Sequence, residues 1–263
     1  MAKIRHVAMM VKDAKRLRDF YVEEFGFEEC YHSASDSYMV TDGLFNLALL
    51  KIRQNDSPLA GTHRADGGEA DQRPGINHFG FVVDNVEEAL ERAGSELVRG
   101  QTPQDGRPAE MRVHDPWGNK FDLSARGYFG REEKRLPAIR RVIHQAEQPA
   151  EVAAFFRERV GLNDEGTGPD GTTYLGDGHI HLEFLPKPLL SKPGIQAIGI
   201  QVDDWATLAQ RFAAMNYSLP RPGAPDGEIV VNDPEGNLLF ISQIGWNERS
   251  GKSAPTLAGA TTA

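Results

Sequence analysis

The chain repeats itself, and this internal repeat limits the folds that it can adopt. The stretch H-D-P-W-G-N-K-F-D-L at His114–Leu123 returns as N-D-P-E-G-N-L-L-F-I at Asn232–Ile241, 118 positions later. Near the start of the two copies the offset is larger, because Ile4 corresponds to Ile139, 135 positions later. The offset changes within Lys51–Gly75, so the sequence predicts two related halves, with a longer Gly-rich loop in the first.

Each half in turn contains a smaller unit twice, with the pattern of a strand, a helix and two or three further strands. Ile4–Val11 is typical of a strand, and Ala14–Phe25 has the 3.6-residue apolar period of a helix that Gly26 ends. The further strands are expected at 31–41, 45–52, 76–83, 111–114, 120–124, 140–146, 172–175, 179–185, 196–202, 228–231 and 238–242, and the further helices at 86–93, 150–160 and 205–215.

Four such units predict an α+β fold with two tandem domains. We expect the first domain at residues 1–130 and the second at residues 136–246. Residues 247–263 are small, polar and aperiodic, so they predict a disordered tail.

Composition excludes several classes of partner. The formal net charge of −9 and the lack of a long basic run argue against binding to nucleic acid or to a membrane surface. The N-terminus has no apolar signal core and no stretch approaches 18 apolar residues, so we expect a cytoplasmic protein. Cys30 is the only cysteine, which excludes an intrachain disulfide.

The fourfold unit, with its D-P-x-G-N turns, resembles the vicinal oxygen chelate superfamily, which includes glyoxalases, bleomycin-resistance proteins and extradiol dioxygenases. The resemblance covers roughly residues 3 to 245. It implies four βαβββ modules arranged as two tandem half-barrels. It also implies a metal ion inside a cup, held by residues of the first and last strands of each module.

Three residues match the ligand positions of that superfamily. His6, His78 and Asp122 each lie on the strand face opposite the apolar side chains, by the two-residue period of a strand. The fourth position is Ala48, so the chain supplies two imidazoles and one carboxylate. This set is typical of non-haem Fe(II), and Mn(II) or Zn(II) would also fit.

Simpler interpretations stay open for these residues. A histidine on a strand is often a hydrogen-bonded core residue, and Asp122 has a shorter arm than the glutamate that is commoner in the superfamily. The Asp122 carboxylate also has two nearby cations in the sequence, Lys120 and Arg112, with either of which it could simply pair.

The second half does not repeat the ligand set. Arg141, Ala197 and Phe240 stand at the positions of His6, His78 and Asp122. Glu183 stands at the position of Ala48, which predicts an Arg141–Glu183 ion pair in place of a metal.

One rival site is possible in the second half. His179, His181 and Glu183 share one face of a strand, and this spacing can bind zinc in other folds. His144 lies on the opposite, helix-facing side, so we expect it to be a buried structural residue.

Three further residues are candidates for catalysis. His63 lies in the long loop before the strand that carries His78, and we expect the loop to be a lid that delivers His63 as the acid–base group. Glu110 and Arg112 share the strand face of Asp122, and Arg112 is expected to hold an anionic group of the substrate.

The leading hypothesis is an Fe(II)-dependent dioxygenase that uses O2 to cleave a ring or a C–C bond of a small compound with vicinal oxygens, such as an aromatic diol or keto-enol. One alternative is a Mn(II) or Zn(II) lyase or isomerase of the glyoxalase type, in which Glu110 or His63 moves the proton. The other is a metal-free, ligand-sequestering protein of the bleomycin-resistance kind. A homo-oligomer is expected in each case.

Overall fold

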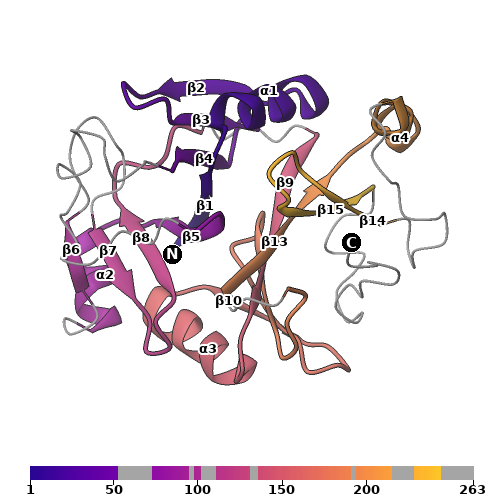
Figure 1. Ribbon diagram of the computed structural model, residues 1–263. Coiled ribbons are helices and arrows are strands. Elements are labelled where there is room, and N and C mark those ends of the chain that lie inside the picture. The colour runs from indigo at the N-terminus through magenta and orange to yellow at the C-terminus, as the bar shows by residue number, and fades with distance from the viewer. Residues whose placement is uncertain are drawn as a thin grey trace.

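The computed structural model describes residues 1–52, 73–94, 98–101, 111–130, 136–190, 194–214 and 228–243 (Figure 1). The expectations for His63, for Glu110, for most of the loop 51–75 and for the tail 247–263 lie outside these residues.

The first half forms one mixed sheet. Its strands are β1 (Lys3–Val11), β2 (Glu28–His32), β3 (Tyr38–Thr41), β4 (Asn46–Lys51), β5 (Gly75–Val82), β6 (Val98–Gln101), β7 (Met111–His114) and β8 (Lys120–Ser124). Among the described residues their order is β2-β3-β4-β1-β5-β8-β7-β6. The two modules therefore meet at β1 and β5, which pair antiparallel.

The second half repeats this arrangement. Its strands are β9 (Ala138–Gln145), β10 (Asn163–Thr167), β11 (Thr173–Gly176), β12 (His181–Leu185), β13 (Gly194–Gln201), β14 (Ile229–Asn232) and β15 (Leu238–Ser242). Their order in the described residues is β10-β11-β12-β9-β13-β15-β14, with β9 and β13 antiparallel at the centre. The expected α+β fold of four modules in two tandem half-barrels is confirmed.

Each module carries one helix. These are α1 (Ala14–Phe25), α2 (Val86–Ala93), α3 (Pro149–Phe155), which continues as the π-helical turn η2 (Phe156–Val160), and α4 (Trp205–Ala214). Asp13 caps the N-terminus of α1, and Gly26 ends it in the left-handed region at φ 68°. None of the helices in the described parts of the chain has both the length and the apolar character needed to span a lipid bilayer.

Three expectations about these elements are wrong. The expected strand 31–41 is two strands, β2 and β3, because Asp36 turns the chain at φ 56°. The expected helix 150–160 is α-helical only to Phe155 before it widens into η2. Strands β6 and β10 were not expected, because both lie at sheet edges and have glycine and polar residues in place of an apolar alternation.

The two D-P-x-G-N motifs are tight turns with the same hydrogen bonds. Oδ1 of Asp115 accepts from the amides of residues 117 and 119, and Oδ1 of Asp233 accepts from those of residues 235 and 237. The glycines take φ 86° at Gly118 and φ 84° at Gly236, where a side chain would be strained. The repeated motif thus fixes the hairpin that leads into β8 and into β15.

These turns also join the halves. Glu235 accepts hydrogen bonds from the amides of Lys12 and Asp13 at the start of α1. At the matching place in the other half, the ring of Trp117 packs edge-on against Phe155 of α3. Each motif of one half therefore contacts the first helix of the other.

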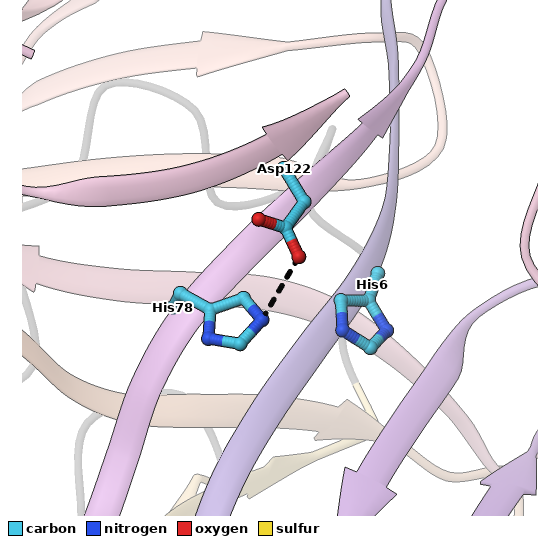
Figure 2. A group of neighbouring side chains, drawn as sticks. All are labelled: His6, His78 and Asp122. Carbon is cyan, nitrogen blue, oxygen red and sulfur yellow. Dashed lines mark ion pairs between the residues drawn. The ribbon is translucent and has the colours of Figure 1, made fainter. Parts of the chain in front are cut away.

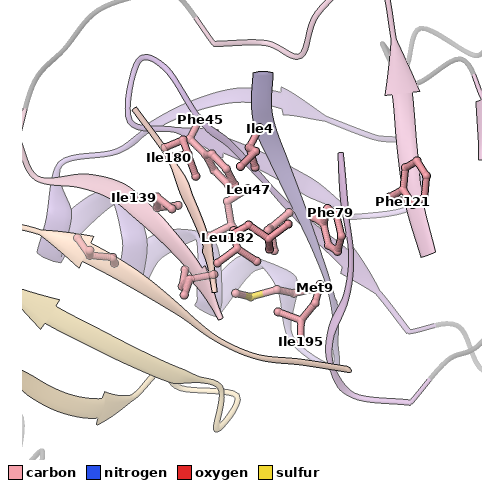
Figure 3. Close-up of a cluster of buried hydrophobic side chains, with 14 of the residues drawn as sticks. Ile4, Met9, Phe45, Leu47, Phe79, Phe121, Ile139, Ile180, Leu182 and Ile195 are labelled. Carbon is pink, nitrogen blue, oxygen red and sulfur yellow. The ribbon is translucent and has the colours of Figure 1, made fainter. Parts of the chain in front are cut away.

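One continuous hydrophobic core fills the space between the halves. It takes buried side chains from both sheets, among them Ile4 and Leu47 from the first and Ile139 and Leu182 from the second (Figure 3). Phe20 of α1 also stacks on Phe212 of α4. The helix-bearing faces of the two half-barrels are thus buried against each other.

Two buried aspartates cross between the halves in a reciprocal way. Oδ2 of Asp177 accepts from the amide of Ile4, 2.8 Å away, and from the guanidinium of Arg5. Oδ2 of Asp42 accepts from the amide of Ile139 at 2.7 Å. Each aspartate therefore anchors the first strand of the other half.

We expect Asp177→Ala to lower the free energy of unfolding by roughly 3–5 kcal/mol, because it leaves the buried Arg5 cation without its partner. Denaturant unfolding measures this change. Asp164→Ala is the matched control, since it removes an exposed ion pair with Arg157 and an exposed hydrogen bond from the Gly166 amide, and it should change stability little. Equal stability of the two variants would contradict the importance of the crossed aspartates.

Candidate metal centre

Three neighbouring strands bring His6, His78 and Asp122 together. Each offers a ligand atom, and these atoms all lie within 4.8 Å of one another in a buried cluster (Figure 2). The strand register explains the convergence, because Gly80 of β5 is paired with His6 on one side and with Asp122 on the other. No other such group of ligand-type side chains occurs among the residues that the structure describes.

Two asparagines orient the imidazoles. Nδ1 of His6 lies 2.8 Å from Oδ1 of Asn46, and Nδ1 of His78 lies 2.9 Å from Oδ1 of Asn77. Each ring that donates from Nδ1 presents the lone pair of Nε2. Metal-binding histidines typically show this outer hydrogen bond, which fixes the tautomer and the ring.

The protonation states also suit a metal. Burial, with the neighbouring His78, lowers the pKa of His6 to about 3. Burial and the Arg112 cation lower the pKa of His78. Burial acts to raise the pKa of Asp122, but Arg112 and His78 outweigh it and hold this pKa below its usual range. At neutral pH the cluster is two neutral imidazoles and one carboxylate, which is the state that binds metal.

Arg112 lies directly beside these ligands. Its Nε donates to Oδ1 of Asp122 at 2.5 Å, and its Nη2 donates to Oδ2 at 2.9 Å. The same Nη2 lies 3.2 Å from Nε2 of His78. Of the two cations considered for Asp122, Arg112 is therefore the one that pairs with it, and its guanidinium occupies the ligand atoms that a metal would use.

The donor set fits a divalent metal ion. When Nδ1 of His78 carries the proton and donates to Asn77, Nε2 is an acceptor 3.2 Å from the acceptor Oδ2 of Asp122, and this arrangement favours a cation between them. Metal bonds of about 2.0–2.2 Å place two ligands of one ion roughly 3–4 Å apart, so small side-chain movements would complete the site. His6, His78 and Asp122 would hold the ion.

The position of the fourth ligand that the sequence resemblance implies is apolar in this protein. Ala48 is buried in a cluster with Ala8 and Met39, against which Tyr31 and Phe129 pack. The rings of Tyr31 and Phe129 stack with centroids 5.4 Å apart. One wall of the site therefore offers an apolar, aromatic surface and no further ligand.

Tyr128 is a site residue that the sequence did not reveal. It follows the last strand of the first half, where no strand period marks its direction. Its ring lies parallel to the imidazole of His6, with centroids 4.6 Å apart and an interplanar angle of 5°. Asn46 and Asn77 were missed for a similar reason, since only tertiary packing shows that they contact the histidines.

The second half fills the equivalent place with an arginine. Arg141 donates from Nε and Nη2 to Glu183, as predicted, and from Nη1 to Oε2 of Glu228 at 2.5 Å. Glu228 was not predicted, although it corresponds to Glu110 at the 118-residue offset. The Arg141 cation is thus shared by two buried carboxylates.

The rival zinc site is not assembled. His181 pairs with Glu165, and Glu183 is used by Arg141. His144 is buried against the rings of Phe79 and Phe184 in the core, as expected for a structural residue. Burial lowers the pKa of His144 to about 4.

Comparison with protein families gives a match over the first half of the chain. Residues 3–123 match the family described as the Glyoxalase/Bleomycin resistance protein/Dioxygenase superfamily. No protein of curated function matches the sequence.

Solved structures share the fold. The Mn(II)-bound glyoxalase from Novosphingobium aromaticivorans is 16% identical, with a TM-score of 0.67 over 92% of this chain and 82% of that one. The 2,3-dioxygenase LapB from Pseudomonas sp. KL28 is 13% identical, with a TM-score of 0.64 over 91% of each chain. BphC, a halotolerant catechol dioxygenase, is 14% identical, with a TM-score of 0.62 over 91% of this chain and 85% of that one. At these identities the likeness shows the fold alone.

We expect His6→Ala or His78→Ala to remove most of the bound divalent metal, because each deletes one of three ligands. Metal content after gel filtration, measured by mass spectrometry, checks this. His144→Ala and His181→Ala are controls that remove a buried histidine elsewhere. Asp122→Glu should retain metal. Undiminished metal in the His78 variant would contradict the site.

Proposed function

We propose that this chain, whose residues 3–123 match the Glyoxalase/Bleomycin resistance protein/Dioxygenase superfamily, is a metal-dependent enzyme acting on a small molecule. We further propose that it is an Fe(II) dioxygenase that cleaves a ring or a C–C bond of an aromatic diol or keto-enol. The supporting observation is the buried cluster of His6, His78 and Asp122.

The number of ligands favours a dioxygenase. Two histidines and one carboxylate leave coordination positions open, as in non-haem Fe(II) oxygenases. The buried methyl group of Ala48 stands where a fourth protein ligand would be, so the open coordination positions of the metal are left for substrate oxygens and O2. When bound, the metal would lower the pKa of a substrate hydroxyl and align it with O2.

The chain's own residues would perform the remaining tasks. His6, His78 and Asp122 hold the ion, and Asn46 and Asn77 keep both imidazoles in the binding tautomer. The apolar wall around Met39, Tyr31 and Phe129 would exclude water and accept an aromatic ring. His63 stays the proposed acid–base group, with Glu110 as the alternative.

A Mn(II) or Zn(II) lyase or isomerase is the second candidate. The same two imidazoles and one carboxylate suit these ions as well as Fe(II). The two reactions differ in their need for O2, because an isomerase or lyase moves a proton without consuming it.

We expect the protein loaded anaerobically with Fe(II) to consume O2 when mixed with a catechol or a keto-enol. One molecule of O2 should be consumed for each molecule of cleaved product. An oxygen electrode and absorbance of the product measure both quantities. The His78→Ala variant is the control for free iron in solution.

The other outcomes separate the alternatives. Turnover without O2 consumption would overturn the dioxygenase and support the lyase or isomerase. Tight binding of the diols without metal and without turnover would support a ligand-sequestering protein instead.

Arg112 points to a substrate with an anionic group. In the structure its guanidinium is bound to Asp122. A divalent ion at the same carboxylate would weaken that pair, since two cations then compete for one anion. Arg112 would be left beside the site to bind a carboxylate of the substrate through two parallel hydrogen bonds.

We expect Arg112→Gln to raise the KM of carboxylate-bearing substrates roughly 10–100-fold, because a charged hydrogen bond is lost. The KM of uncharged analogues should stay the same. The same variant should bind metal more tightly, because a competing cation is gone. Steady-state kinetics and metal titration test both effects. Lys120→Gln is the control, because it removes the other cation on the Asp122 face of β8 and leaves the Arg112–Asp122 pair in place. Weaker metal binding in Arg112→Gln would show instead that Arg112 orients Asp122.

The cytoplasmic location and the homo-oligomeric state expected from the sequence stay predictions.

A further inference from the structure

The segment that follows β8 folds back across the metal-bearing face of the first sheet. Its Tyr128 lies against His6, and its Phe129 lies against Tyr31. Its Gly130 passes so close to Leu44 that a Cβ there would lie 2.5 Å from the Leu44 carbonyl oxygen. The segment thus crosses from the last strand of the sheet over β1 toward β2, with Tyr128 at the metal centre.

Gly80 makes room for Tyr128. A Cβ at this position would lie 2.4 Å from the Tyr128 hydroxyl oxygen and 2.8 Å from its Cζ, distances that real Cβ atoms do not show. Gly80 is paired with both His6 and Asp122. The hydroxyl end of Tyr128 therefore lies above the strand that separates these two ligands.

The second half uses the equivalent glycine in another way. Gly199 is paired with Arg141 on one side and with Phe240 on the other. A Cβ at Gly199 would lie 2.8–3.3 Å from three carbons of the Arg141 side chain. In both halves the missing side chain makes room for a group that lies over this strand, which is Tyr128 in one half and Arg141 in the other.

We propose that Tyr128 is a positioning residue of the metal centre. Its ring supports the face of the His6 imidazole while Asn46 holds the ring edge through Nδ1. A histidine side chain turns about two bonds, so a contact on its edge alone leaves the ring free to tilt, and a contact on its face removes that freedom. This role of Tyr128 rests on the proposed function, in which His6, His78 and Asp122 hold a metal ion.

The first test compares two variants of Tyr128. Tyr128→Leu keeps apolar volume but removes the aromatic face, and we expect it to bind Co(II) 10–100-fold more weakly, as for other outer contacts of metal ligands. Tyr128→Phe retains the ring and should bind Co(II) like the wild type, with the same visible spectrum. Unchanged affinity in Tyr128→Leu, or equal weakening in both variants, would overturn the proposal.

The second test uses the close contact with Gly80. Gly80→Ala should weaken Co(II) binding in the wild type, because the new methyl group displaces the Tyr128 ring. In the Tyr128→Leu background the same change should cost less, since the contacts with the Tyr128 ring at 2.4 and 2.8 Å are gone and the contact with Cβ of His6 at 3.1 Å needs only a small shift. Such a double-mutant cycle isolates the coupling of the two positions. Equal costs in both backgrounds would overturn the proposal.

A third measurement is independent of metal. In the metal-free protein the stacked Tyr128 ring should shift the NMR signals of the His6 ring protons, and Tyr128→Leu should remove this shift while Tyr128→Phe retains it. Unchanged His6 signals in Tyr128→Leu would overturn the proposal. A protein that binds Co(II) but consumes no O2 would overturn only the proposed reaction, so the two failures are distinguishable.

Discussion

A buried carboxylate needs a cation, and both half-barrels are organised around that need. In the first, Asp122 is completely enclosed and takes Arg112 as its partner, with two neutral imidazoles beside it. Removal of Arg112 would leave the Asp122 carboxylate buried without compensation. The arrangement of ligands in the first cup is therefore inseparable from a positive charge at its centre, whether that charge comes from a guanidinium or from a metal ion.

The second half meets the same need without an open site. Arg141 stands at the position that corresponds to His6, and its guanidinium pairs with Glu183 and Glu228. These two carboxylates stand at the positions that correspond to Ala48 and Glu110. Burial acts to lower the pKa of Arg141, but the two carboxylates raise it above its usual range, so this cation is permanent. A covalently attached charge cannot leave, which explains how this cup keeps the fold and carries none of the ligand set of the first.

Strand periodicity predicted the three ligand positions, because the face of a strand residue depends only on its parity within one element. The same reasoning predicted the Arg141–Glu183 pair.

Strand periodicity could not predict Tyr128, whose segment has no period, or Asn77, whose contact with His78 depends on a side-chain rotamer. The repeat offset relates Glu228 to Glu110, yet the pairing of Glu228 with Arg141 was not predicted. The pattern of a single strand does not show that one arginine has two partners. The edge strand β10 lacks apolar alternation because its residues are exposed or half-buried, and β6 has only the short sequence V-R-G-Q.

The second half also determines where a ligand of the first half lies. Asp177 holds the amide of Ile4 and the side chain of Arg5, immediately before His6 on β1. Asp42 holds β9 in the same way, just before Arg141. His6 in one half and Arg141 in the other are therefore each anchored, within two positions, by an aspartate of the opposite half. Because the core between the halves is continuous, β1 cannot shift without disturbing both sheets. The half without the ligand set thus contributes rigidity to the metal centre through the start of β1, which is a physical reason for the two halves to remain in one chain.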